Sequence, residues 1–383
     1  NLTAQRVGGT LSTVLTVTNN ATAGAFSEDL NASFSGFVNG ATGSGSIAGR
    51  LAGTSNTGVG SMSVGLDTTT SGVKSGTATL AYATAGAVNG VNNGLGVASV
   101  GTQLVTVNGN VYAPAVAQLN TPAVNFGVVR VGDPEPVMTV SVSNTTSGAL
   151  TDTLRASLNG SAAPFTASGT AAAVVAGATD ASNLRVTLNT GTAGVYSGTN
   201  AVVTFTSQNP EMADLALGTA NVALSATVNN LAATTLAKTS GVGDLSGGAL
   251  SYTLNFGSVK LGDNGGSTAL SLTNSAFGPA DALAGTFNLS ALQVGDPFLL
   301  GGFNSFDSLA AGSSLAGGLT VGFSGTSLGS FDRVIVLSRL STNGSGPDLG
   351  LAAVELHLHG EVLAVPEPGT YGMMLTGLLV VMF

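Results

Sequence analysis

The chemically versatile side chains of this sequence are few, and three of them stand together near its end. Glu355, His357 and His359 alternate with Leu356 and Leu358 in the segment "ELHLH". In a β-strand this spacing puts one carboxylate and two imidazoles on the same face, a donor set that suits zinc. The alternative is a solvated strand face opposite two buried leucines, which we favour because nothing else in the sequence completes a ligand set. We therefore expect no metal and no other cofactor.

Catalytic machinery is equally sparse. Catalysis by Ser or Thr would need one of the only two His as its base, and no Gly-x-Ser-x-Gly elbow accompanies them. A Gly-rich stretch, "GVGDLSGG" at residues 241–248, is weakly similar to a phosphate-binding loop but lacks the Gly-Lys-Ser ending. We interpret this stretch as a linker between repeats, and we expect the protein not to be an enzyme.

Asp133 and Asp263 recur at matching places, after Val-Gly and Leu-Gly respectively. Carboxylates at a domain junction could bind calcium, but an Asp that caps a turn is far commoner. We favour the turn-capping interpretation.

Composition and charge exclude some functions. The 383 residues include no Cys, and only 8% of them are charged. The formal net charge is −9 and ten Lys and Arg are scattered along the chain, which argues against nucleic acid, since phosphate binding needs clustered basic residues. Abundant Thr, Ser and Asn can hydrate a surface without charge, as suits an exported surface or matrix protein. Because the sequence opens at Asn1 in a strand-like stretch, we expect it to begin after removal of a signal peptide.

The body of the chain repeats itself about every 120 to 130 residues, a period that fits a tandem array of whole domains. Each repeat opens with a basic residue, an apolar residue and Gly, followed by a turn and an alternating strand that ends in Asn. The openings are "RVGGTLSTVLTVTNN" from Arg6, "RVGDPEPVMTVSVSNT" from Arg130 and "KLGDNGGSTALSLTNS" from Lys260.

Within a repeat the local signals are those of strands and tight turns. Val140 and Val142 alternate with Ser141 and Ser143, the pattern of a sheet with one buried face. We predict a β-sandwich of about seven or more strands per repeat. Phe126, Phe165, Tyr196 and Phe205 are expected in the middle core, and the Asn-Gly pairs that begin at Asn89, Asn93, Asn108 and Asn159 are expected in hairpin turns. The Gly- and Ser-rich residues 36–65 predict long, mobile loops.

The middle repeat, with Phe126-Gly127, Val131-Gly132, "VSVSN", Pro164-Phe165 and Tyr196-Ser197-Gly198, resembles an ASH-type (Hydin-like) immunoglobulin-like domain of bacterial choice-of-anchor proteins. The third repeat keeps Phe256-Gly257 but has Phe331-Asp332-Arg333 in place of Tyr-Ser-Gly. The first has Leu2-Thr3 in place of Phe-Gly, and Lys74 in place of Tyr196. The resemblance implies immunoglobulin-like sandwiches of seven or eight strands without catalysis.

The end of the chain combines a proline motif with an apolar run. Val365, Pro366, Glu367 and Pro368 precede it, and the two prolines keep the backbone extended and remove two amide donors. This arrangement resembles the PEP-CTERM sorting signal of Gram-negative bacteria, which implies a transmembrane helix, a terminal Arg cluster and cleavage near the motif by an exosortase. The segment expected in the membrane comprises Tyr371, Met373, Met374, Leu375, Leu378, Leu379, Val380, Val381, Met382 and Phe383.

The tail departs from that pattern in its length. Only 15 residues remain from Gly369 onward, against about 20 for a spanning helix, and no Arg cluster follows. The alternatives are a degenerate signal, a short helix packed on the protein itself, or a sequence that is cut short, which we favour.

Together these observations predict an all-β protein of three tandem immunoglobulin-like β-sandwich domains at residues 1–119, 120–236 and 237–364, with a sorting signal and short hydrophobic helix at 365–383. Two functions compete. One is an exported structural protein of a bacterial surface layer, filament or biofilm matrix, which assembles with itself. The other is a membrane-anchored subunit whose sandwich loops bind a glycan or a neighbouring envelope protein.

Overall fold

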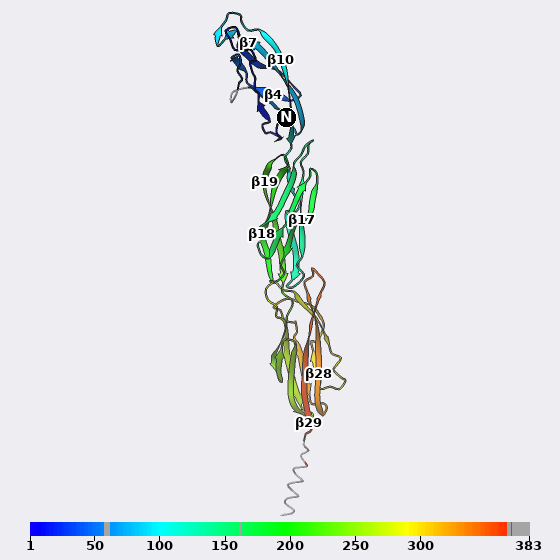
Figure 1. The fold of residues 1–383 in the computed structure, drawn as a ribbon. Coiled ribbons are helices and arrows are strands. Elements are labelled where there is room, and N and C mark those ends of the chain that lie inside the picture. The colour runs from blue at the N-terminus through cyan, green and yellow to red at the C-terminus, as the bar shows by residue number, and fades with distance from the viewer. Residues whose placement is uncertain (57–61, 161, 366–368, 370–383) are drawn as a thin grey trace, which may run out of the picture. The chain divides into compact units, whose positions relative to one another are not determined.

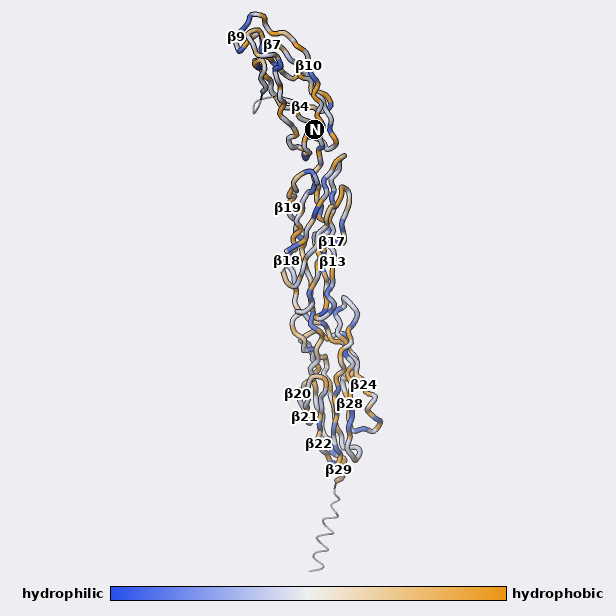
Figure 2. The backbone as a smooth tube through the Cα atoms, viewed as in Figure 1, coloured by the Kyte–Doolittle hydropathy of each residue, from blue (hydrophilic) through white to orange (hydrophobic). Residues whose placement is uncertain are grey.

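The computed structural model describes residues 1–56, 62–160, 162–365 and 369 (Figure 1). Every named element within these residues is a β-strand, which confirms the all-β prediction. The predicted C-terminal helix lies outside the described residues. In Figure 2, apolar and polar residues alternate along the strands, as expected for sheets with one buried face.

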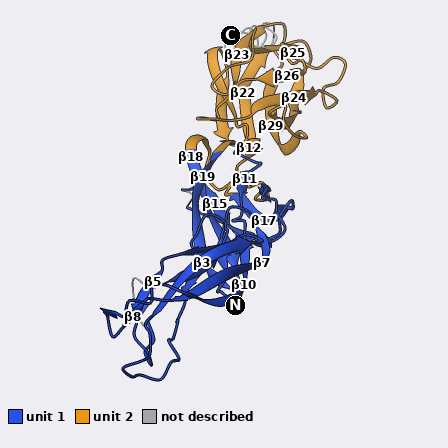
Figure 3. Ribbon diagram, turned by 90° about the horizontal axis from the view of Figure 1, so that it is seen from above, with its two compact units in different colours: residues 1–124, 137–187, 199–223 blue, residues 125–136, 188–198, 224–383 orange. Residues whose placement is uncertain are grey.

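The chain divides into two compact units, which are coloured separately in Figure 3. Unit 1 comprises residues 1–124, 137–187 and 199–223, and unit 2 comprises residues 125–136, 188–198 and 224–383. The predicted division into three domains stays a prediction. The strands themselves form three successive pairs of sheets, of which the first lies in unit 1, the third lies in unit 2, and the second contributes residues to both.

The first pair joins a five-stranded sheet, in the order β1-β10-β7-β3-β5, to a three-stranded sheet, in the order β2-β6-β4. A small hairpin, β8-β9, follows β7. Val64 and Leu66 from the smaller sheet, and Leu11 just before β2, pack with Ala78 and Val111 from the larger one. The bounds are β1 (Gln5–Arg6), β2 (Ser12–Val14), β3 (Leu30–Val38), β4 (Ala41–Ser44), β5 (Ile47–Arg50), β6 (Ser63–Leu66), β7 (Gly72–Thr84), β8 (Ala87–Val88), β9 (Val91–Asn92) and β10 (Ser99–Tyr112).

The second pair consists of sheets in the orders β11-β13-β17-β15 and β12-β19-β18-β14-β16. Val140 and Val142 are fully buried, as their alternation predicts, and so are the predicted core residues Phe165 and Phe205, whereas Phe126 and Tyr196 are only partly buried. The bounds are β11 (Ala117–Leu119), β12 (Ala123–Arg130), β13 (Val137–Asn144), β14 (Thr153–Asn159), β15 (Phe165–Ser168), β16 (Thr170–Val174), β17 (Thr179–Leu188), β18 (Gly194–Asn209) and β19 (Met212–Asn229).

The third pair consists of sheets in the orders β20-β23-β27-β25 and β21-β22-β29-β28-β24-β26. Leu270 and Phe323 from the first sheet and Leu254, Ile335 and Leu356 from the second belong to one hydrophobic core, so this pair is a β-sandwich. The bounds are β20 (Thr234–Gly241), β21 (Asp244–Gly248), β22 (Ser251–Lys260), β23 (Asn264–Asn274), β24 (Ala282–Asn288), β25 (Phe298–Gly301), β26 (Phe306–Leu309), β27 (Leu319–Ser324), β28 (Gly329–Thr342) and β29 (Leu349–Leu363).

One prediction for a Gly-rich segment is wrong in part, and a second is wrong. Within the stretch 36–65, β4, β5 and β6 form where long loops are expected, whereas residues 51–56 and 62 belong to no named strand. Gly43 shows why, since a Cβ there would lie 2.7 Å from the Phe37 ring and 2.9 Å from the Phe34 ring. The glycine permits close packing rather than mobility. Likewise, residues 241–248 are not a linker, because they include the end of β20 and all of β21.

The prediction of hairpin turns at Asn-Gly pairs is confirmed at Asn89, where Asn89 and Gly90 both have positive φ in the two-residue β8-β9 turn. Gly94 and Gly160 also have positive φ, but they follow β9 and β14, which the sheet orders do not pair with the next strand. The pair Asn108-Gly109 is an exception, because it lies inside β10 and pairs with β7.

Candidate functional site

The basic residue that opens each repeat occupies the same backbone frame in all three sheet pairs. Arg6, Arg130 and Lys260 each end a strand that lies beside the last strand of its own sheet pair. The next residue then donates its amide to that last strand. These bonds run from Val7 N to Tyr112 O (2.9 Å), from Val131 N to Asn229 O (2.8 Å) and from Leu261 N to Leu363 O (2.8 Å). We call this basic residue and the three residues after it the junction turn.

In unit 1 the first junction turn is tied to the sheet that contains β14. Arg6 Nε donates to Asp152 Oδ2 at 2.6 Å, and its Nη1 donates to the Ala213 carbonyl at 2.9 Å. Asp152 is 1% exposed. The ion pair is therefore a buried link between the first sheet pair and the part of the second that belongs to the same unit.

In unit 2 the second junction turn repeats this arrangement. Arg130 Nε donates to Asp281 Oδ2 at 2.5 Å, and its two terminal nitrogens donate to the carbonyls of Pro347 (2.9 Å) and Ser341 (3.1 Å). Arg130 is 6% exposed and Asp281 is 1% exposed. The same chemical contact thus occurs once in each unit, at the equivalent residue of successive repeats.

Each buried Asp receives further hydrogen bonds that satisfy its carboxylate. Ser207 Oγ donates to Asp152 Oδ2 at 2.7 Å, and Ser341 Oγ donates to Asp281 Oδ2 at 2.9 Å. An Asn amide completes each site, from Asn209 to Asp152 Oδ1 (2.8 Å) and from Asn229 to Asp281 Oδ1 (2.9 Å). A buried carboxylate with a cation and two neutral donors is compensated on both oxygens.

A buried Asn positions the backbone of each Asp. Asn144 Nδ2 donates to the carbonyls of Asp152 (3.2 Å) and Val174 (3.0 Å). Asn274 Nδ2 donates in the same way to the carbonyls of Asp281 (3.0 Å) and Leu309 (2.9 Å). These are the Asn residues that end the alternating strand of each repeat in the sequence. These hydrogen bonds explain why an Asn recurs at that place in the repeats of this chain.

The Asp partners of these junctions were missed by sequence reasoning. The repeats show Arg6 and Arg130, but Asp152 and Asp281 lie 146 and 151 residues further on, in the following repeat. A usable signal was present, because each Asp stands two residues before a Leu that is 0% exposed, Leu154 and Leu283. An acid so close to a buried strand position needs a partner.

The predicted metal candidates separate into pairs. His357 Nε2 lies 3.2 Å from Glu355 Oε2, whereas His359 Nδ1 lies 2.7 Å from Asp332 Oδ1 on β28. Across the part of the chain that the structure describes, no three His, Asp or Glu side chains gather as metal ligands. Leu356 and Leu358 are buried on the opposite face, as in the solvated-face interpretation.

Asp133 acts within its own turn. Its Oδ2 accepts a hydrogen bond from Arg130 N at 2.9 Å, and its carbonyl accepts one from Thr190 Oγ1 at 2.6 Å. At the third junction turn, Asp263 N donates to the Lys260 carbonyl at 3.0 Å. Asp133 therefore caps the turn that presents Arg130, as the turn-capping interpretation predicts.

The predicted sorting motif falls almost entirely outside the described residues. Val365 is described and is 49% exposed. The other motif residues, Pro366 to Pro368, and the predicted membrane segment from Tyr371 to Phe383 are not among the described residues. Within the described part of the chain, no helix meets the length and hydropathy needed to span a membrane.

The clearest perturbed titratable pair is structural in kind. Arg333 donates from Nε to Asp296 Oδ2 and from Nη2 to Asp296 Oδ1, both at 2.5 Å. The hydrogen bonds from Arg333 hold the pKa of the Asp296 carboxyl below its usual value, and burial opposes them in part. This forked pair joins β28 to the loop before β25.

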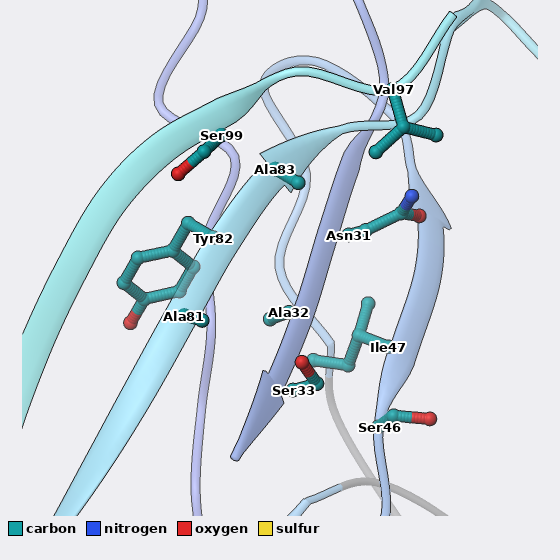
Figure 4. Close-up of a pocket in the computed structure, with 10 residues that line it drawn as sticks. All are labelled: Asn31, Ala32, Ser33, Ser46, Ile47, Ala81, Tyr82, Ala83, Val97 and Ser99. Atoms are coloured by element: carbon teal, nitrogen blue, oxygen red, sulfur yellow. The ribbon is translucent and has the colours of Figure 1, made fainter. Parts of the chain in front are cut away.

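A shallow hollow of about 340 Å³ lies on the first sheet pair and is shown in Figure 4. Tyr82 on β7 lines it together with Asn31 and Ser33 on β3, Ile47 on β5 and Ser99 on β10. The Tyr82 hydroxyl donates to Gln103 Oε1 at 2.8 Å, and burial raises the pKa of Tyr82. Since Tyr82 pairs with Ala32 in the register, its ring lies on the core-facing side of the sheet, whereas Asn31 and Ser33 point to the other side. The amide and hydroxyl groups that line the hollow are suited to binding a polar ligand such as a sugar.

Comparisons with known proteins identify no family. No protein-family model matches the sequence, and no curated protein matches it. Among solved structures, the chain is similar to the extracellular cadherin domains 1–5 of protocadherin gamma B2, with 11% identity and a TM-score of 0.38 over 95% of this chain and 59% of that one. It is also similar to mouse protocadherin-24 EC1-3, with 11% identity and a TM-score of 0.37 over 94% and 96%.

A marsupial T cell receptor is a third similar structure, with 12% identity and a TM-score of 0.28 over 91% of this chain and 96% of that one. All three TM-scores are low, so we infer neither family nor function from them.

Proposed function

We propose that this chain is an exported, non-enzymatic structural protein of a Gram-negative bacterial cell surface or extracellular matrix. It would consist of tandem immunoglobulin-like sandwiches, be sorted through its C-terminal signal by an exosortase, and contribute to a surface layer, filament or biofilm. The observation that supports it best is the junction ion pair, which recurs with the same donors at Arg6–Asp152 and Arg130–Asp281.

A recurring buried junction favours a mechanical role over a chemical one. Each Arg donates to one Asp and to backbone carbonyls, so the guanidinium fixes the direction of the link as well as its distance. A buried ion pair adds little net stability compared with apolar packing, but its geometry is specific. We infer that the junctions serve to hold neighbouring sandwiches of each unit in one orientation.

Mass spectrometry of the C-terminus of the native protein tests this proposal. We expect the mature chain to end beside Pro368, because the Pro-Glu-Pro sequence resembles a motif near which a processing enzyme cuts. A mature protein that retains the apolar run through Phe383 would contradict sorting and release.

The second candidate function is a membrane-anchored accessory subunit that binds a glycan or another envelope protein. The hollow on the first sheet pair favours it, since the side chains of Asn31, Ser33 and Ser99 line it with amide and hydroxyl groups (Figure 4). An intact C-terminal run would also support this candidate. Its direct test is a glycan-binding screen in which Asn31→Ala abolishes any binding found for the unmodified chain, while Asn183→Ala, at an exposed Asn on β17, leaves it unchanged.

A further inference from the structure

The repeat pattern leaves two junction positions without a partner in the described residues. They are the basic residue of the third repeat and the acid position of the first. Three junction turns exist, but only Arg6 and Arg130 pair with an acid in the described residues. The third basic residue, Lys260, is exposed. Likewise, Asp152 and Asp281 belong to the second and third sheet pairs, which raises the question of what stands at their position in the first.

The position equivalent to Asp152 and Asp281 is Glu28. The same Asn marks it, because Asn19 Nδ2 donates to the carbonyls of Glu28 and Arg50, both at 3.0 Å. The strand register agrees: Leu30 pairs with Arg50 just as Leu154 pairs with Val174 and Leu283 with Leu309. In each case the acid stands two residues before this Leu.

The surroundings of Glu28 also match those of the buried Asp residues. Thr84 faces Leu30 in the register, where Ser207 faces Leu154 and Ser341 faces Leu283. In the second and third sheet pairs the amide of an incoming residue donates to this hydroxyl, from Ala115 (2.8 Å) and Ala232 (3.0 Å). In the first sheet pair, Ala98 N donates to Thr84 Oγ1 at 3.1 Å.

Residues 85–98, which include the β8-β9 hairpin, therefore take the place of the incoming chain; we call them the cap. Ala87 O accepts a hydrogen bond from Asp29 N at 2.8 Å, one residue beyond the position at which Asp152 N and Asp281 N donate to the incoming chain. Asn93 Nδ2 donates to Glu28 Oε1. Glu28 remains partly exposed beside the cap. No cation among the described residues pairs with it, whereas an Arg neutralises the acid at both equivalent positions.

Each unpaired position lies next to a segment with exposed apolar side chains. On the cap, Val91, Leu95 and Val97 are 70%, 80% and 68% exposed. Leu261 follows Lys260 and Leu363 pairs with it, and they are 40% and 45% exposed. Opposite charges that are each accompanied by exposed apolar side chains are suited to a complementary interface.

We propose that copies of this chain associate with one another head to tail, with Lys260 of one copy bound to Glu28 of the next. The contact reproduces the internal junction with Lys for Arg and Glu for Asp. Glu carries its carboxylate one methylene further out, which suits an acid that lies beside the cap rather than beneath an incoming strand. Such a heterologous contact does not use the same patch twice, so it links copies into rings or open chains. This inference rests on the proposed function and deepens it, since a surface layer or filament needs contacts between copies.

Zero-length carbodiimide cross-linking of the full chain in nonionic detergent tests the contact, with a mixture of ¹⁵N-labelled and unlabelled protein to identify bonds between copies. The chain has only three Lys, at positions 74, 238 and 260, so the alternatives are few. We expect a cross-link between Lys260 of one copy and Glu28 of another. Cross-links between copies only at Lys74 or Lys238 would overturn the proposal.

Charge-reversal variants provide the decisive experiment. Lys260→Glu and Glu28→Lys should each weaken self-association at least about tenfold in sedimentation velocity, because like charges then meet. Mixing the two variants should restore it, since every contact between the two kinds of chain again joins opposite charges. Lys238→Glu is the matched control and should associate normally. Unchanged association of Lys260→Glu, or no recovery in the mixture, contradicts the proposal.

The two proposals fail separately. If the protein is processed at its C-terminus and recovered from the cell surface but does not associate through these residues, only the head-to-tail contact is contradicted. If the protein associates through Lys260 and Glu28 but is neither processed nor exported, only the proposed surface function is contradicted.

Discussion

Arg130 lies 2.5 Å from Asp281 although 151 residues of sequence separate the two. Both side chains are buried, and Ser341 and Asn229 complete the hydrogen bonding of the carboxylate. The equivalent pair at Arg6 and Asp152 shows that the contact belongs to the repeat and not to one place in it. The repeat therefore encodes an acid at one end of a sandwich and a base at the other.

Removing one partner of this pair should be costly. Asp281→Ala leaves the Arg130 guanidinium buried without its carboxylate, so we expect the free energy of unfolding to fall by about 3–5 kcal/mol. Chemical denaturation followed by circular dichroism measures it. Asp307→Ala, at an exposed Asp of the same unit, is the control and should change stability by less than about 0.5 kcal/mol. Equal effects of the two substitutions would show that the pair is structurally unimportant.

A second prediction concerns close packing at a glycine. A Cβ on Gly360 would lie 2.5 Å from the ring of Phe323, which is 1% exposed and has no room to move. We expect Gly360→Ala to lower the free energy of unfolding by about 1–3 kcal/mol through overpacking. Gly350→Ala lies on the same strand with open space around it, and it should be neutral or slightly stabilising. A neutral Gly360→Ala would contradict the packing described for this core.

The Asp296–Arg333 pair predicts a pH dependence. Because the pKa of Asp296 is lowered in the folded protein, mainly by its hydrogen bonds from Arg333, the pair contributes stability above the ordinary Asp pKa. That contribution is lost as the pH falls through the lowered pKa. Unfolding measured from pH 7 downward should therefore show a smaller acid-induced loss in Arg333→Met than in the unmodified chain. Parallel profiles for the two proteins would contradict this assignment.

The fourth prediction concerns the effect of zinc on thermal stability. Glu355 pairs with His357 while His359 pairs with Asp332, so we expect Zn²⁺ to leave the midpoint of thermal unfolding unchanged. Differential scanning calorimetry with and without the metal measures it. A rise of the midpoint that His359→Ala abolishes would revive the metal site.

The sequence predicted the fold class well where local pattern decides it. Alternation placed Val140 and Val142 in the core, and Asn89-Gly90 predicted a hairpin turn with two positive φ angles. Both signals depend only on neighbouring residues, because the side-chain period of a strand and the steric freedom of Gly are local properties.

Prediction from the sequence failed at glycines that make room for side chains of residues distant in the sequence. Gly109 lies inside β10, and a Cβ there would lie 3.0 Å from Cδ2 of Leu11, a residue far away in sequence. Gly43 similarly accommodates two Phe rings. Composition alone does not separate a glycine that bends the chain from one that admits a neighbour.

The sequence revealed only the basic residues of the junction and not their partners, for a similar reason. Arg6 and Arg130 stand out in the repeated openings, but their partners belong to the next repeat, and pairwise contacts between repeats leave no periodic signal. The backbone frame that aligns Glu28 with Asp152 and Asp281 is visible only through the hydrogen bonds of Asn19, Asn144 and Asn274.

Surface exposure in intact cells is the most direct test of the structural role. Proteinase K treatment of unbroken cells, followed by mass spectrometry of the released peptides, measures it, with a cytoplasmic protein monitored for lysis. The account predicts that peptides from all three sheet pairs are released before any cytoplasmic marker appears. Peptides that appear only after the cells are broken, together with recovery of the protein in the cytoplasmic fraction, would contradict it.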